Sequence, residues 1–148
     1  MSTLNLYIKP VINPVLTSFC TGLTGITQNL LNEKGKSIND AIKIFAGYTS
    51  DCRKIVSWGN YDKKFLYDAI IRNNIKENPW LDVLNMLLFK HVNLKEVMKL
   101  TCKMKPIDLQ NAMKYFGINP TGKLHNALDD SLNTHKIYKK VMKKCKLK

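Results

Sequence analysis

The sequence is poor in acidic residues, and none of them lies near its start. Its 148 residues include 24 Lys and Arg but only 11 Asp and Glu, which gives a formal net charge of +13. The first acid along the chain is Glu33, and 22 of the 24 basic residues are lysine. This excess favours a polyanionic partner, most often a nucleic acid, because lysines placed on phosphates release condensed counterions. A lysine surface that only maintains solubility is the alternative.

Long apolar runs and a secretory leader are also missing from the sequence. No stretch of about 18 apolar residues occurs, which argues against a membrane-spanning helix. The segment from Met1 to Leu6 has neither the basic region nor the apolar region of a signal peptide. We therefore expect an intracellular protein, cytoplasmic or nuclear, with no membrane partner. Its length suits one domain over residues 1–148 that buries its own core.

Closely spaced cysteines are missing as well. Cys20, Cys52, Cys102 and Cys145 are separated by 32, 50 and 43 positions, so no CxxC pair is available for a zinc site. In an intracellular chain we expect reduced and partly buried thiols. The sequence gives them no function.

The hydrophobic pattern predicts alternating strands and helices, which is typical of the α/β class. Residues 3–8 and 52–58 are predicted to be strands, and residues 11–24 a loop with a short helical turn. Apolar spacing and capping residues, Ser37 among them, predict the helices. They cover residues 37–45, 61–74, 94–100, 107–116 and 127–145.

Two details of this pattern bear on the fold. Residues 79–84 fit either a strand or the start of a helix, and the sequence leaves both open. In the C-terminal helix, one face collects the less polar side chains. They are Leu128, Leu132, His135, Met142 and Cys145.

The segment from Gly122 to Ser131 carries the first candidate site. His125 ends a loop and Asp130 follows five positions later, in the first turn of a helix, so both side chains can face one pocket. The helix N-terminus favours the ionised form of Asp130, whose carboxylate suits a hard divalent ion. A neutral His125 beside such an ion can take a proton from metal-bound water. In the alternative, Asp129 caps the helix and His125 is an ordinary loop residue.

Asp62 is the second candidate. It follows the predicted strand at residues 52–58, at the strand end where open α/β sheets place their sites. Tyr61 beside it can stack on a base. The alternative makes Asp62 the N-cap of the next helix.

A glycine-containing stretch is the third candidate. It contains Phe19, whose ring offers an aromatic face to a nucleobase, and glycines that permit close backbone approach. The alternative is an ordinary connection packed by Leu23 and Ile26.

Four runs at matching spacing resemble one family. They are Tyr-x-x-Pro-x-Ile-Asn-Pro from Tyr7, Phe-Cys-x-x-Leu-Thr-Gly-Ile-Thr-Gln from Phe19, Ser-Trp-Gly-Asn-x-Asp from Ser57 and His-x-x-Leu-Asp-Asp-Ser from His125. Together they span residues 7–131 and resemble the DEDDh 3′-to-5′ exonucleases. The likeness is to the Eri-type and KapD-like branch of the family that includes RNase T and the proofreading subunit of bacterial DNA polymerase III.

The resemblance implies a ribonuclease-H-like α/β fold that removes nucleotides from 3′ ends with two Mg²⁺ or Mn²⁺ ions. It assigns Asp62 and Asp130 as metal ligands, and His125 as the general base that activates water. The positions where the family wraps the 3′-terminal nucleotide are Phe19, Leu23, Thr24 and Tyr61. The expected partner is a single-stranded 3′ end, and the Eri-type likeness favours RNA over DNA.

One family motif has no counterpart in the sequence. The Asp-x-Glu of the first strand supplies the principal metal ligands and is expected well before Tyr7, where this chain has only six residues, none of them acidic. We therefore expect an N-terminally truncated fold without its first two sheet strands, and an incomplete two-metal site. Little or no exonuclease activity is expected from the chain alone.

Three hypotheses remain open on this basis. The chain is part of an active exonuclease, or a catalytically dead relative that binds nucleic acid through the same residues, or a degenerate product with no retained role. A partner strand or a second copy in a homodimer would fill the vacancy in the sheet. The seven lysines after Asp130 are a further candidate surface for phosphates.

Overall fold

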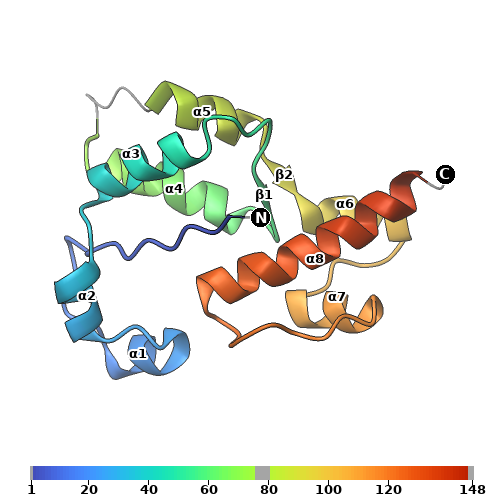
Figure 1. Cartoon of the computed structure of the whole chain (residues 1–148), viewed down its shortest axis with the longest axis horizontal. Coiled ribbons are helices and arrows are strands. Elements are labelled where there is room, and N and C mark those ends of the chain that lie inside the picture. The colour runs from blue at the N-terminus through green and yellow to red at the C-terminus, as the bar shows by residue number, and fades with distance from the viewer. Residues whose placement is uncertain (1, 76–80, 147–148) are drawn as a thin grey trace.

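The computed structural model describes residues 2–75 and 81–146, which are mostly helical (Figure 1). The helices are α1 (Ser18–Thr24), α2 (Gln28–Lys34), α3 (Ile38–Tyr48), α4 (Tyr61–Arg72), α5 (Leu81–Phe89), α6 (Leu94–Cys102), α7 (Leu109–Tyr115) and α8 (Ala127–Lys146). The strands are β1 (Val56–Ser57) and β2 (Val92–Asn93). None of the helices in the described part of the chain is long and apolar enough to cross a membrane.

The two strands form one short parallel pair in which Val56 lies opposite Val92. A parallel pair needs a crossover connection, and α4 and α5 provide it. In Figure 1 the pair lies between α3, α4 and α5 on one side and α6, α7 and α8 on the other. The strand predicted over residues 52–58 is therefore confirmed only at Val56 and Ser57.

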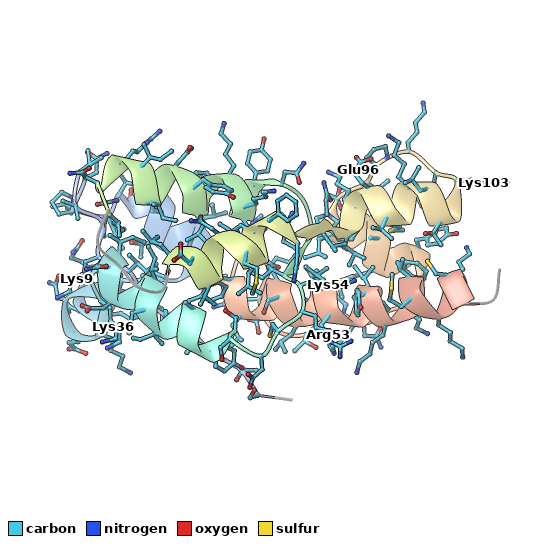
Figure 2. The ribbon with its side chains drawn as sticks, turned by 90° about the horizontal axis from the view of Figure 1, so that it is seen from above. Lys9, Lys36, Arg53, Lys54, Glu96 and Lys103 are labelled. Carbon is cyan, nitrogen blue, oxygen red and sulfur yellow. The ribbon has the colours of Figure 1, made fainter. Side chains whose placement is uncertain are left out.

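The strand predicted over residues 3–8 is wrong. This segment makes a single parallel bridge, between Ile8 and Lys36, with Lys9 N donating to Lys36 O at 2.9 Å. A regular strand needs a ladder of such bonds, and the partner segment ends because Ser37, directly after Lys36, is the N-cap of α3. Figure 2 shows Lys9 and Lys36 together at one end of the molecule, with Glu96 and Lys103 at the other. The α/β prediction thus holds only for the central parallel pair.

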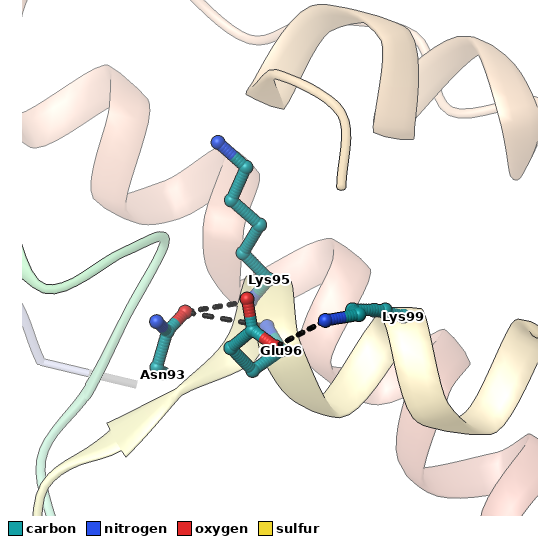
Figure 3. A network of polar contacts seen from close by, with 4 residues as sticks. All are labelled: Asn93, Lys95, Glu96 and Lys99. Atoms are coloured by element: carbon teal, nitrogen blue, oxygen red, sulfur yellow. Dashed lines mark hydrogen bonds and ion pairs between the residues drawn. The ribbon is translucent and has the colours of Figure 1, made fainter. Parts of the chain in front are cut away.

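The helices begin where the sequence carries capping side chains. Ser37 Oγ accepts a hydrogen bond from Asp40 N at 3.1 Å and begins α3, as predicted. Asn93 does the same for α6, since its Oδ1 accepts from the N–H groups of Lys95 and Glu96 (Figure 3). The chain therefore passes from β2 into α6 without a loop.

Two other predictions change in detail. The helix predicted over residues 107–116 starts later, because Asp108 caps α7 by accepting from Asn111 N at 2.8 Å. It ends before Gly117, as predicted. Residues 79–84 were left open between a strand and a helix, and residues 81–84 begin the helix α5. Pro79 and Trp80 lie outside the described residues.

Two hydrophobic clusters make up the core, one on each side of the strand pair. The buried side chains of the first are Leu94, Met98, Ala112, Met113, Ile137 and Val141, from α6, α7 and α8. Those of the second are Ile42, Leu84 and Leu88, from α3 and α5. Each cluster joins helices on one side of the pair, so β1 and β2 are the connection between them.

The predicted buried face of α8 is only partly right. On α8 the buried apolar positions are Ile137 and Val141, whereas Cys145 is exposed and its Sγ lies 3.4 Å from Thr101 Oγ1 near the end of α6. On α4, Phe65 and Ile71 are exposed as well. Two of the four thiols, Cys52 and Cys145, are exposed rather than partly buried, and all four are free.

Candidate functional site

The loop that joins α7 to α8 carries His125, and α8 anchors it. Asn133, which is 1% exposed, bonds to Thr121 in both directions. Thr121 N donates to Asn133 Oδ1 at 2.9 Å, and Asn133 Nδ2 donates to Thr121 O at 3.1 Å. Lys136, one turn further along α8, donates to Asn119 O at 3.0 Å. Paired buried groups of this kind fix the loop backbone against the helix.

The end of the loop is held by two more side chains. Asp129 Oδ2 accepts from Lys123 N at 2.9 Å, and the carboxylate fills the space where a Cβ at Gly122 would lie. Asn126 Oδ1 accepts from the N–H groups of Leu128 and Asp129. The helix cap is therefore Asn126, and the alternative that gave this role to Asp129 is wrong.

The structure brings His125 and Asp130 together. His125 has a φ of +63° and an exposed ring. Burial raises the pKa of the Asp130 carboxyl, although a hydrogen bond from the His125 backbone and the charge of its ring act in the opposite direction. The helix N-terminus was expected to favour the ionised form of Asp130, and burial of the carboxyl acts against it.

Asp130 also has an oxygen without a partner. Its Oδ1 is buried and accepts no hydrogen bond from any described residue. An ionised carboxylate in that position lowers the stability of the folded chain.

Asp130→Asn should therefore stabilise the fold at neutral pH, by about 1 kcal/mol. The folded protein holds the carboxyl proton more tightly than the unfolded chain does, so unfolding becomes easier as the pH rises through the raised pKa. The gain from Asn should accordingly vanish near pH 4 and below. Urea unfolding in a chelating buffer at several pH values measures it. Asp129→Asn is the control and should destabilise, because it weakens the bond to Lys123 N.

Asp62 lies exposed in the first turn of α4. The N-cap position is Asn60, which makes no side-chain capping bond, so the alternative that Asp62 is the cap is wrong. The charge of Asp62 acts on His91, whose pKa is lowered overall by burial and by Lys63. Nothing among the described contacts joins Asp62 to Asp130.

A polar junction that the motifs did not predict lies beside Asp62. Ser57 Oγ donates to Gly59 O at 2.6 Å, so His91 Nε2, 2.7 Å away, donates to the same hydroxyl. The junction closes the ends of β1 and β2. No local signal was available, because the contact joins residues 34 positions apart and no strand was predicted at residues 92–93.

The predicted nucleotide-binding side chains differ in exposure. Phe19 and Tyr61 are 73% and 75% exposed, so their rings are accessible. Leu23 is 39% exposed. Thr24 is half-buried, and its hydroxyl donates to Cys20 O at 2.8 Å.

Lys123 connects the α1 region to the His125 loop. Its Nζ lies beside Gly25, the left-handed residue that ends α1, at 3.9 Å from the position of a Cβ there. The loop residue two positions before His125 therefore reaches the helix that carries Phe19 and Leu23. This proximity places two of the four sequence motifs on neighbouring parts of the surface: the loop that carries His125 and the α1 segment that carries Phe19.

The described residues fit only part of a metal site. Within residues 2–75 and 81–146, no three His, Cys, Asp or Glu side chains are grouped closely enough to hold an ion. The unpartnered Oδ1 of Asp130 suits one bond to a hard cation. The two-ion arrangement implied by the resemblance is not formed by these side chains.

Asn133 and Lys136 are the anchoring residues that the motifs missed. A signal was present, because polar side chains recur at positions 126, 129, 133 and 136, which share one helical face. A polar stripe on a helix that otherwise packs in the core indicates a buried network.

Comparison with known proteins finds similarity to exonucleases. The RNase T family, described as exonucleases, matches residues 2–138. Probable 3′-5′ exonuclease KapD of Bacillus subtilis (strain 168) is 30% identical over 95% of this chain and 65% of its own length. ERI1 exoribonuclease 2 of Xenopus laevis is 28% identical over 92% of this chain, which spans only 22% of that protein.

Solved structures share the fold. The nuclease domain of 3′hExo, a DEDDh family member bound to rAMP, superposes with a TM-score of 0.79 at 20% identity, over 93% of this chain and 70% of that one. A 3′-exonuclease described by its 3′-end specific recognition of a histone mRNA stem-loop gives 0.81 at 19% identity, over 97% and 64%. The chain therefore belongs to the RNase T family of exonucleases, the DEDDh group that its four motifs resemble.

Proposed function

We propose that the chain binds the 3′ end of a single-stranded nucleic acid, RNA in preference to DNA. The observation that carries the proposal is the anchored loop, which presents His125 and brings Lys123 beside the end of α1. The names of the relatives support RNA, since they include an exoribonuclease and an exonuclease that recognises an mRNA 3′ end. The net charge of +13 favours a polyanion.

The residues have distinct proposed roles in this complex. Phe19 and Tyr61 stack on the terminal bases through their exposed rings, and Leu23 and Thr24 contact the terminal nucleotide. His125 accepts the proton of the attacking water.

The proposed ligands for Mg²⁺ or Mn²⁺ are Asp130 and Asp62. A bound divalent ion would stabilise negative charge on the phosphate. Because the described side chains group fewer than three ligands, we propose that hydrolysis by this polypeptide is weak or absent and that binding is its main activity. A single domain over residues 1–148 and assembly with a second chain stay predictions.

The first test is the affinity for a fluorescent single-stranded RNA in a buffer that contains chelator. Phe19→Ala should weaken binding about tenfold, because base stacking on an aromatic ring contributes about 1–3 kcal/mol. Phe89→Ala is a matched control: Phe89 is 85% exposed on α5, and its replacement should leave the affinity unchanged. Equal effects of the two variants would contradict the proposal, as would an affinity that does not fall with added salt.

A further inference from the structure

A pocket lies outside the four motif positions assigned to the terminal nucleotide. It has a volume of about 320 Å³ and lies between residues 10–13 and one face of α4. Phe65, Asp68 and Arg72 line the α4 side. The pocket thus starts one helical turn beyond Tyr61 and extends away from the N-terminal end of α4.

The α4 side of this pocket begins with an exposed aromatic pair. Phe65 is 67% exposed, and its ring stacks on that of Tyr61 at a centroid separation of 6.3 Å. Residues four apart lie on the same helical face, and Arg72 follows Phe65 after two further turns. From Tyr61 to Arg72 the helix rises about 16 Å. One face of α4 therefore presents two aromatic rings and then a guanidinium.

The groups around Phe65 suit a nucleotide. Arg72 is exposed and forms no ion pair within the described ranges, so its guanidinium is available to a phosphate. The Asp68 carboxylate can accept hydrogen bonds from base amino groups. On the opposite wall, Val11 and Ile12 are 72% and 71% exposed and provide apolar contact for a ribose or base face.

We propose that this pocket binds a nucleotide upstream of the 3′-terminal one, with the base on Phe65 and a phosphate on Arg72. The inference rests on the proposed function, because Tyr61 would hold the terminal nucleotide and Phe65 would continue the same track. It predicts that affinity increases with the length of the strand. A nucleic acid fits better than an acidic peptide, because stacked aromatic rings contact every base in succession.

The test compares a mononucleotide, AMP, with single-stranded RNA of about eight nucleotides, a length within the site sizes of single-strand-binding folds. Arg72→Ala should weaken binding of the longer RNA about five- to tenfold and leave the affinity for AMP unchanged. Phe65→Ala should weaken binding of the longer RNA by a similar factor and AMP by much less, because Phe65 contacts AMP only through Tyr61. Because both residues lie on the helix surface, we expect the circular dichroism and the Tm of both variants to equal those of the unmodified chain, which checks that they fold. Phe89→Ala on α5 is again the control for the loss of an exposed ring.

The possible outcomes separate the two proposals. If the unmodified chain binds neither AMP nor RNA, the proposed function fails. If it binds both and Phe65→Ala leaves the longer RNA unaffected, the pocket proposal alone is overturned. Equal losses for AMP and RNA would also overturn it, because Phe65 would then act on the terminal nucleotide. An effect of Phe65→Ala only on self-association, measured by sedimentation, would assign the pocket to a second copy and contradict the proposal.

Discussion

Asn133→Ala should lower the free energy of unfolding by about 2–4 kcal/mol. The amide is 1% exposed, and its removal leaves both the N–H and the carbonyl of Thr121 without their partner. The loop would then lose its main attachment to α8. Affinity for single-stranded RNA should fall together with stability, because the same attachment positions Lys123 and His125.

Urea unfolding and RNA binding on the same preparations measure the two effects. Lys140→Arg is the control, since Lys140 is exposed on the same helix and arginine keeps both the positive charge and the helical propensity. A variant that loses stability but keeps full RNA affinity would show that the loop does not need Asn133 to reach its binding position.

Gly122→Ala should destabilise the chain by about 2–4 kcal/mol, for two separate reasons. Gly122 has a φ of +66°, which costs an alanine about 1–2 kcal/mol. Its Cβ would also overlap the carboxylate of Asp129, which is held in place by Lys123 N. The overlap either moves Asp129 or breaks its bond to the loop.

Gly117 separates the two reasons. Its φ of +60° is similar, but a Cβ there would meet nothing within 4 Å, so Gly117→Ala should cost only about 1 kcal/mol. Equal losses in the two glycine variants would mean that backbone strain alone is responsible. The close packing of Gly122 on Asp129 would then contribute nothing to stability.

Five of the described helices, α3, α4, α6, α7 and α8, were predictable because their signals are local, whereas α2 was not predicted. Ser37 caps α3 through its own hydroxyl, and the glycine at 117 follows the end of α7 in the expected left-handed conformation. Neither signal depends on distant parts of the chain. The long C-terminal helix was found for the same reason, although the position of Cys145 at its exposed end depends on where α6 stops.

The strands were harder to predict, because pairing depends on a distant partner. Residues 3–8 alternate like a strand, yet only Ile8 has a bridging partner, at Lys36. Within residues 52–58, only Val56 and Ser57 pair with another strand, at Val92 and Asn93. Alternation in the sequence shows the capacity to pair, and the neighbours determine whether pairing occurs.

The candidate site was predictable to a similar extent. The spacing of His125 and Asp130 indicated neighbouring residues, and the His125 backbone and ring charge do act on the Asp130 carboxyl. That both side chains face one pocket stays a prediction. The anchoring by Asn133 and Lys136 depends on a loop that folds back from residues 119–121. The polar stripe on α8 indicates that a polar partner exists, but it does not show which segment supplies it. The roles of Asp62, His125 and Asp130 in catalysis stay predictions.

The most direct test of 3′-end recognition compares binding of one RNA sequence in two forms, linear and circular, with the same length and composition. A site for the 3′ end predicts at least tenfold tighter binding of the linear form, and loss of that preference in Phe19→Ala. Electrostatic attraction alone acts on both forms alike. Equal affinities for the linear and circular RNA would contradict the central claim that this chain recognises a 3′ end.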